Sequence, residues 1–252
     1  APLRSSSQPP SPRQATRQFV NRSRVLRSLV LSCAVVLATA CGKPSEVDLV
    51  ASARTAMSRG DFAAAVVELK RALQANPRSD QARLLLGLSL LESGDPAGGL
   101  VELEKASESG IDETETAPAI ARALLLTGRA GQVIDRFSGV ELKDPKAFAE
   151  LRASLATAYL QQGLRERARA AVETALRSDP KNTTAQLLGA RFLATDGNVD
   201  GALAQVDKLL TEHPQLLDGW LLKGELLWLG KRDRAAAATA FEASLAVQTN
   251  YL

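Results

Sequence analysis

The chain has 252 residues, of which 45% are hydrophobic and only 4% are aromatic. Alanine and leucine dominate, which favours helices over β-sheets, because sheets prefer β-branched and aromatic residues. The formal net charge is +3, but six arginines and no acid lie within residues 1–40, so the remainder carries more acid than base. Its signs are interspersed, and this excludes the clustered basic surface that nucleic-acid binding requires.

The N-terminal part has the features of an exported leader. Residues 1–24 are rich in Ser, Pro, Gln and Arg, and such a segment cannot bury enough apolar surface to fold. An apolar run over residues 28–38 follows three arginines and is too short to span a bilayer as a lasting helix. We therefore interpret residues 1–40 as a disordered leader plus a signal peptide.

Cys41 follows the small residues Thr39 and Ala40, an arrangement that resembles a lipobox. The resemblance implies that the thiol is diacylglycerated and becomes the new N-terminus, with residues 41–45 as a lipidated tether. Ala38 departs from the pattern, which usually has Leu there. The alternative is an ordinary signal cut near Ala40 that leaves Cys41 as a free thiol. Lipidation is favoured because an exposed thiol is reactive, and no cysteine follows Gly42.

A lipidated chain would be anchored in the bacterial cell envelope and face the periplasm, because acyl chains bind a bilayer firmly. Gly42 stands where lipoproteins retained in the inner membrane often have Asp. We therefore expect the outer membrane rather than the inner one.

Glycines recur at a nearly constant spacing along the rest of the chain. The steps between them are 34, 34, 35, 34 and 33 residues, from Gly60 through Gly94, Gly128, Gly163 and Gly197 to Gly230. Each glycine separates two stretches of helical periodicity. Glycine accepts the left-handed conformation at a helix end, and the Asp or Asn that follows several of these glycines caps the next helix. The unit is therefore a helix–turn–helix of about 34 residues.

This pattern resembles the tetratricopeptide repeat. Second helices carry a small, a large and a small residue at fixed spacing, as in Ala65, Leu69 and Ala72. The resemblance implies an all-α, right-handed superhelical solenoid of about six repeats. The third repeat has a short second helix near residues 130–137, and the sixth has one extra residue between Gly224 and Ala237. We place the repeats near residues 46–79, 80–113, 114–148, 149–182, 183–216 and 217–250.

Residues 250–252 read as the start of a seventh repeat, because Thr249 stands where three earlier repeats have proline. Solenoids end in polar capping helices, and the sixth repeat has none. We expect the array to continue beyond the C-terminus.

Four stretches resemble one particular family in their amino-acid sequence: residues 40–44 (ACGKP), 63–77 (AAAVVELKRALQANP), 90–99 (LLESGDPAGG) and 121–125 (ARALL). The family is the TPR-repeat lipoprotein (PrsT-like) of exosortase, or PEP-CTERM, systems, which accompany exopolysaccharide biosynthesis. The resemblance implies a scaffold that faces the periplasm and serves polysaccharide export or surface-protein sorting.

Motifs for catalysis are absent from the sequence. His213 is the only histidine, so no His and Cys set can hold a metal, and no phosphate loop, G-x-S-x-G or H-E-x-x-H is present. We expect no catalytic residue, metal or cofactor, and a protein that is not an enzyme.

The expected working surface is the concave face, which first helices line in tetratricopeptide arrays. We expect it to bind extended or helical segments of other proteins through leucines and scattered arginines, unless part of this set is core. The candidate residues are Arg54, Leu84, Leu88, Leu91, Arg122, Leu125, Leu160, Leu187, Arg191, Leu221 and Trp228. Trp220 matches a packing position, and we expect it in the core.

Three functional hypotheses remain at this point. The first is a membrane-anchored scaffold for exopolysaccharide export or PEP-CTERM sorting. The second is a general outer-membrane assembly or secretion lipoprotein of the pilotin kind. The third is the regulatory repeat region of an enzyme whose catalytic domain lies elsewhere.

Overall fold

The computed structural model describes residues 44–249, and the compact unit that it shows begins at Glu46. The predicted leader, the signal peptide and Cys41 lie outside the described residues, as do residues 250–252. No helix within residues 44–249 is long and apolar enough to cross a membrane.

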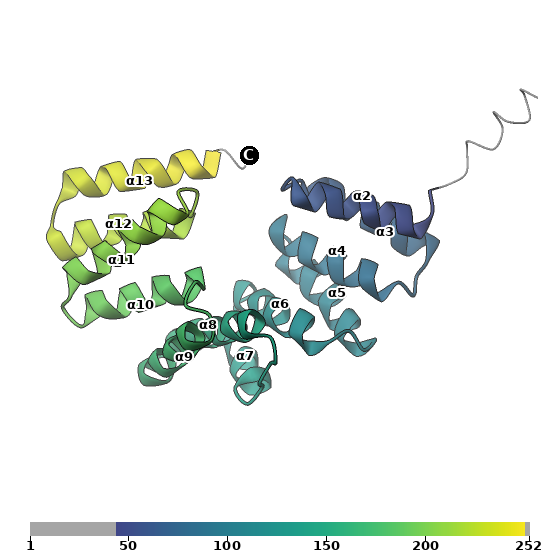
Figure 1. Ribbon diagram of the computed structural model, residues 1–252, viewed down its shortest axis with the longest axis horizontal. Coiled ribbons are helices and arrows are strands. Elements are labelled where there is room, and N and C mark those ends of the chain that lie inside the picture. Colours follow the sequence, from purple (N-terminus) through teal and green to yellow (C-terminus); the bar gives the residue numbers. More distant parts are fainter. Residues whose placement is uncertain (1–43, 250–252) are drawn as a thin grey trace, which may run out of the picture. The chain divides into compact units, whose positions relative to one another are not determined.

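The described chain is built from helices joined by short turns, and no strand occurs between residues 44 and 249. Successive helices lie side by side in pairs along the array (Figure 1). This confirms the predicted all-α solenoid. In chain order the helices are α2 (Glu46–Ser58), α3 (Phe62–Ala75), α4 (Asp80–Glu92), α5 (Pro96–Glu108), α6 (Glu113–Leu126), α7 (Ala130–Phe137), α8 (Pro145–Gln161), α9 (Arg165–Ser178), α10 (Thr183–Thr195), α11 (Val199–Glu212), α12 (Leu217–Glu225), η1 (Leu226–Lys231) and α13 (Arg234–Thr249).

The turns within the first five pairs all use the predicted glycine, and three of them use the predicted side-chain cap. The five repeating glycines from Gly60 to Gly197 all have φ between 72° and 89°, a region that residues with a Cβ rarely adopt. Three of the residues that follow them, Asp61, Asp95 and Asn198, each accept a hydrogen bond of 2.9 Å from a backbone N–H of the next helix. Each such cap satisfies a donor that the helix end leaves free.

Small residues set the distance between the two helices of a pair. Ala65 and Ala72 on α3 are fully buried, as are Ala168 and Ala175 on α9. Leu69, which lies between the two alanines of α3, is fully buried as well. Close approach at the small residues lets the large ones fill the remaining volume, as in any well-packed interior.

The third pair departs from the others because α7 has only 8 residues. The segment that follows it is held by Arg152 on α8. The Arg152 guanidinium donates to the carbonyl oxygens of Ser138 at 3.1 Å and Val140 at 2.9 Å, and it lies 4.6 Å from the centre of the Phe148 ring. These bonds satisfy carbonyls that a full-length helix would have paired internally.

The sixth pair contains the extra residue, and the structure accommodates it as a π-helix. Residues Leu226–Lys231 form η1, and Arg232 then takes the left-handed conformation with φ 57°. The expectation that Gly230 is the turn glycine of this repeat is wrong, because Gly230 lies within η1. A π-helix is the usual way in which one inserted residue fits into an α-helix.

Candidate partner-binding surface

The structure divides the predicted first-helix residues into surface and core. Leu84, Leu91 and Leu187 are buried, with exposed fractions of 2%, 5% and 9%, and they contribute to packing. Leu88, Leu125, Leu160 and Leu221 are partly buried, whereas Arg54, Arg122, Arg191 and Trp228 are exposed. A partner could therefore contact the three arginines, Trp228 and the exposed parts of the four partly buried leucines.

Two of the exposed arginines form ion pairs between neighbouring first helices. Arg122 on α6 pairs with Glu92 on α4, and Arg191 on α10 pairs with Glu225 on α12 at 2.8 Å. The hydrogen bond with Glu92 raises the pKa of the Arg122 guanidinium. Desolvation raises the pKa of nearby Glu150, and the positive charge of Arg122 acts in the opposite direction and lowers it. Carboxylates of the chain itself thus already pair with two of the three predicted arginines, Arg122 and Arg191.

A cavity of about 480 Å³ lies between the last three first helices of the described chain. That volume is within the range of ordinary ligand pockets, roughly 300–1,000 Å³. We call it the repeat-five pocket, because α10 of the fifth repeat supplies five of its lining residues. It is lined by Leu160, Arg165, Leu188, Arg191, Phe192, Ala194, Thr195, Val199, Leu222, Glu225, Leu226, Leu229 and Gly230.

The repeat-five pocket contains only two of the predicted residues, Leu160 and Arg191. Its apolar walls come mostly from residues that sequence reasoning missed, such as Leu188, Phe192 and Leu226. The sequence did hold one signal for it. The extra residue of the sixth repeat becomes η1, and η1 supplies three lining residues at one edge of the pocket.

Gly230 lets η1 approach α11 closely at this edge. A Cβ at Gly230 would lie 2.6 Å from Cγ1 of Val199, which is closer than real carbon atoms come in a packed protein. The absence of a side chain at Gly230 therefore sets the position of the pocket wall formed by η1.

Arg165 also lines the pocket, and Arg169 lies next to it. Arg169 pairs with Asp196 at 2.9 Å, and Arg165 reaches the same carboxylate at 3.4 Å. Both guanidiniums lie over the Phe192 ring, with Cζ at 4.6 Å from its centre for Arg169 and 5.5 Å for Arg165. The hydrogen bond from Arg169 is the main cause of the lowered pKa of Asp196. The Asp196 carboxylate thus pairs with two guanidiniums, and its contact with Arg165 is longer than its contact with Arg169.

The two tryptophans of the sixth repeat have different surroundings. Trp220 is partly buried and packs against the core cluster of the fifth and sixth pairs, near the expected position, and its Nε1 donates to the carbonyl oxygen of Pro214 at 2.9 Å. Trp228 is 50% exposed, and the adjacent Leu229 is 75% exposed. Of these two, Leu229 lines the repeat-five pocket.

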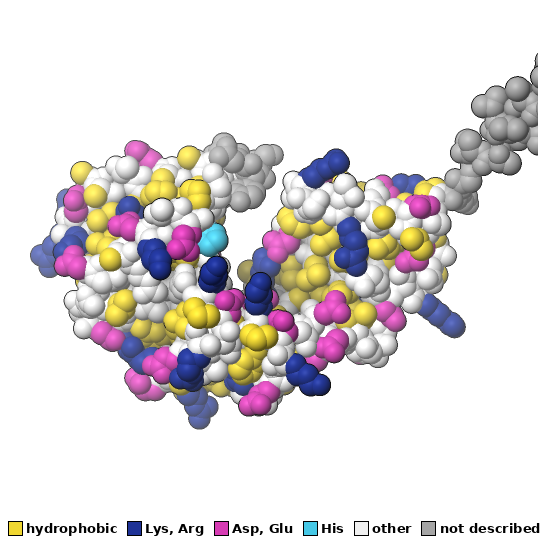
Figure 2. All heavy atoms as spheres, in the orientation of Figure 1, with side chains coloured by type: hydrophobic (Ala, Val, Ile, Leu, Met, Phe, Trp, Pro, Cys, Tyr) yellow, Lys and Arg dark blue, Asp and Glu magenta, His cyan; other side chains and the backbone are white. Residues whose placement is uncertain are grey.

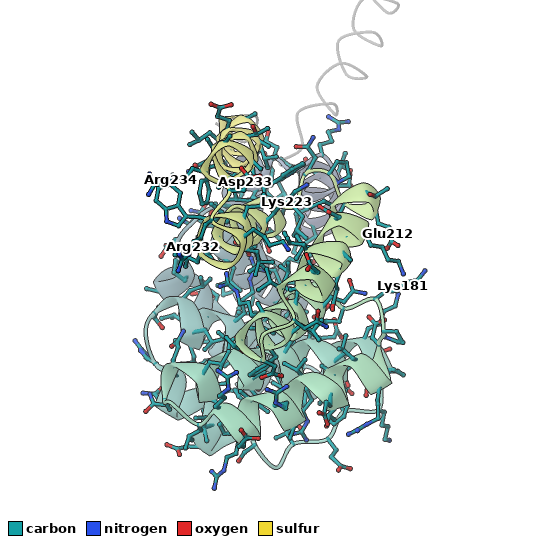
Figure 3. The ribbon with its side chains drawn as sticks, turned by 90° about the vertical axis from the view of Figure 1, so that its left-hand side faces the viewer. Lys181, Glu212, Lys223, Arg232, Asp233 and Arg234 are labelled. Atoms are coloured by element: carbon teal, nitrogen blue, oxygen red, sulfur yellow. The ribbon has the colours of Figure 1, made fainter. Side chains whose placement is uncertain are left out.

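Charged residues surround this part of the array, but they do not form a surface of a single sign. Figure 3 shows Arg232, Asp233 and Arg234 together at the turn that leads into α13, while Lys181 and Glu212 lie on the other side of that view. On the face shown in Figure 2, basic and acidic side chains are interspersed and hydrophobic ones form separate patches. No group of three or more His, Cys, Asp or Glu within the described residues could hold a metal ion.

Known structures with a similar fold are all-helical repeat proteins. A thermophilic TPR protein of Thermus thermophilus is 21% identical, with a TM-score of 0.60 over 73% of this chain and 100% of that chain. PilF of Pseudomonas aeruginosa is 20% identical, with a TM-score of 0.58 over 77% and 88%. PilW, a type IV pilus biogenesis factor, is 17% identical, with a TM-score of 0.58 over 83% and 95%. At this identity the likeness concerns the fold.

No curated protein matches the chain. The sequence signature of the tetratricopeptide repeat matches residues 50–118 and 154–216, which together make up more than half of the 252 residues. The matches flank the short α7 and end before the irregular sixth pair. The chain belongs to the tetratricopeptide repeat family.

Proposed function

We propose that this tetratricopeptide scaffold is anchored by lipid on Cys41 and binds other proteins in exopolysaccharide export or in the sorting of PEP-CTERM surface proteins. The protein-binding part rests on the repeat-five pocket, an open and mainly apolar cavity on a solenoid. Solenoids present extended surfaces to partners. The sequence alone supports the anchor and the pathway. The anchor rests on the lipobox-like residues before Cys41, and the pathway rests on the family resemblance of residues 63–77 and 90–99.

The anchor is tested with two cysteine variants. Cys41→Ser should abolish incorporation of labelled palmitate and move the protein to the soluble periplasmic fraction. Cys33→Ser is the matched control, because Cys33 lies within the apolar run that processing would remove. It should leave labelling unchanged. Equal labelling of the Cys41→Ser protein would disprove the anchor.

The pathway is tested by deleting the gene and complementing the deletion. Surface exopolysaccharide, or the processing of PEP-CTERM proteins, should fall in the deletion strain and recover with the wild-type gene. The Cys41→Ser gene should restore either phenotype only in part, because it lacks the anchor. Normal exopolysaccharide and normal processing in the deletion strain would refute this assignment.

The second candidate is a lipoprotein that assists pilus assembly or secretion. PilF and PilW share the fold over most of their length, and PilW is a type IV pilus biogenesis factor. The same deletion strain separates the two candidates. Loss of surface pili with normal exopolysaccharide would favour the pilus role, and loss of exopolysaccharide with normal pili would favour the first proposal.

A further inference from the structure

We infer that the repeat-five pocket takes a bulky apolar side chain from a partner peptide and that Arg165 at its rim binds an adjacent acidic residue of that peptide. This inference rests on the proposed protein-binding function and specifies the chemistry of the partner. It concerns a pocket to which the irregular sixth repeat contributes Leu222, Glu225, Leu226, Leu229 and Gly230.

The interior of the pocket is suited to an apolar group. Leu188, Phe192, Leu222 and Leu226 are each 9% exposed or less, and they line the cavity together. A side chain that enters would leave water for an apolar environment, which favours binding of a residue such as Leu or Phe. At the mouth, Leu229 is 75% exposed and would be covered by the same peptide.

The one-residue insertion shapes one wall of the pocket, the wall formed by η1. A π-helix turns less per residue than an α-helix, so side chains after Leu226 are rotated from the positions they hold in the other repeats. Leu229 and Gly230 are thereby placed at the pocket, and Gly230 lies against Val199. π-Helices of a single turn occur frequently at functional sites.

The charges at the pocket favour an acidic partner. The charged residues that line the pocket are two arginines, Arg165 and Arg191, and one carboxylate, Glu225. Outside the lining, Asp196 pairs with Arg169 and Arg165, and the charges of Glu166 and Glu173 also act on Arg169. Glu225 is taken by Arg191 and Asp196 mainly by Arg169, which leaves Arg165 as the guanidinium with the weakest acidic contact at 3.4 Å. Arg165 also bonds the Thr195 hydroxyl and lies over the Phe192 ring, so its position is fixed. A guanidinium held in this way can bind a carboxylate at two points.

The test uses a fluorescein-labelled synthetic peptide with a Leu-Phe-Leu centre flanked by Asp and Glu, and fluorescence anisotropy as the readout. Two further peptides serve as probes, one with Lys in place of the acids and one with Ser in place of Phe. The acidic apolar peptide should bind wild-type protein at least about tenfold more tightly than either, since a charge-assisted bond or a buried side chain corresponds to roughly that ratio.

Two pairs of variants locate the binding. Leu229→Glu should weaken binding of the acidic peptide about tenfold or more, by placing a like charge at the mouth. Leu126→Glu is its control, because Leu126 is also exposed at the end of a first helix but lies on α6. Arg165→Glu should likewise weaken binding, whereas Arg129→Glu at the turn before α7 should not. All four residues are exposed, so each variant should keep its helical circular dichroism and thermal midpoint.

Several results would overturn the inference. Binding that is unchanged in Leu229→Glu and Arg165→Glu would place the peptide elsewhere. Preference for the Lys peptide would contradict the charge argument. Binding of sodium decanoate without any of the peptides would assign the pocket to an amphiphile, and a change in sedimentation caused by Leu229→Glu would assign it to a second copy of the chain. If instead Leu229→Glu lost peptide binding while the deletion strain had normal exopolysaccharide and normal PEP-CTERM processing, the pocket would stand and the proposed pathway would fail.

Discussion

Gly87 on α4 lies so close to Leu103 on α5 that a Cβ at Gly87 would be 2.6 Å from Cγ of Leu103. Leu103 is fully buried and cannot move aside without disturbing its own neighbours. The same crossing brings Gly99 near the backbone of Gly87, since a Cβ at Gly99 would lie 2.9 Å from the Gly87 carbonyl oxygen. The second pair is thus held by backbone-to-backbone approach at two glycines.

Gly87→Ala is therefore expected to destabilise the protein. Alanine favours a helix interior over glycine by about 1 kcal/mol, but overpacking a filled core costs roughly 1–3 kcal/mol, so the free energy of unfolding should fall. Gly131→Ala is the control, because Gly131 lies in α7 with nothing within 4 Å of its Cβ position. It should leave stability equal or higher. Urea unfolding of both variants checks this, and a stabilised Gly87→Ala would contradict the packing described.

The periodicity of the sequence predicted the helix pairs well because turns and caps are local. A glycine followed by Asp or Asn acts through its own backbone and needs no distant partner. The same reasoning failed at Gly230, because a periodic count assumes that every helix is an α-helix. Only the three-dimensional packing shows that η1 moves the left-handed residue to Arg232.

The candidate site was less predictable because it depends on contacts between repeats. Leu84, Leu88 and Leu91 share one helix, yet only Leu88 is partly exposed. Which of them reach the surface depends on how tightly α4 packs against α6. Likewise the sequence shows Arg191 as a charged residue, but it cannot show that Glu225 lies 2.8 Å away across a repeat boundary.

Arg232 provides a test of the π-helix. A residue with a Cβ in the left-handed region costs about 1–2 kcal/mol, and glycine removes that cost while adding up to about 1 kcal/mol of unfolded-state entropy. Arg232→Gly should therefore leave the thermal midpoint equal or slightly higher. Gly197→Ala, which introduces a Cβ at φ 89°, should lower it. A marked loss of stability in Arg232→Gly would mean that the turn does not have this conformation.

Ser89 on α4 is expected to be replaceable with a gain in stability. It is fully buried, and no group in the described part of the chain forms a hydrogen bond with its hydroxyl. An unpaired buried hydroxyl costs roughly 1–3 kcal/mol, so Ser89→Ala should raise the free energy of unfolding by about 1 kcal/mol. Ser52→Ala on the exposed face of α2 controls for helix propensity and should have a smaller effect. Equal effects would show that Ser89 is solvated.

Asp196 should titrate at a pH that depends on Arg169. The hydrogen bond from Arg169 is the first cause of the lowered Asp196 pKa, and Arg165 adds to it. Because the folded-state pKa lies below the unfolded one, this carboxylate stabilises the fold at pH values above its unfolded pKa, about 4. That contribution is lost as the pH falls through the folded value.

Arg169→Gln should raise the Asp196 pKa, measured by carboxyl NMR, without fully restoring its ordinary value, since Arg165 remains. Asp112 is the internal control, because a hydrogen bond with Thr114 lowers its pKa and that bond involves neither arginine. An Asp196 pKa that did not move, or an Asp112 pKa that moved with it, would show that the guanidinium of Arg169 is not the cause.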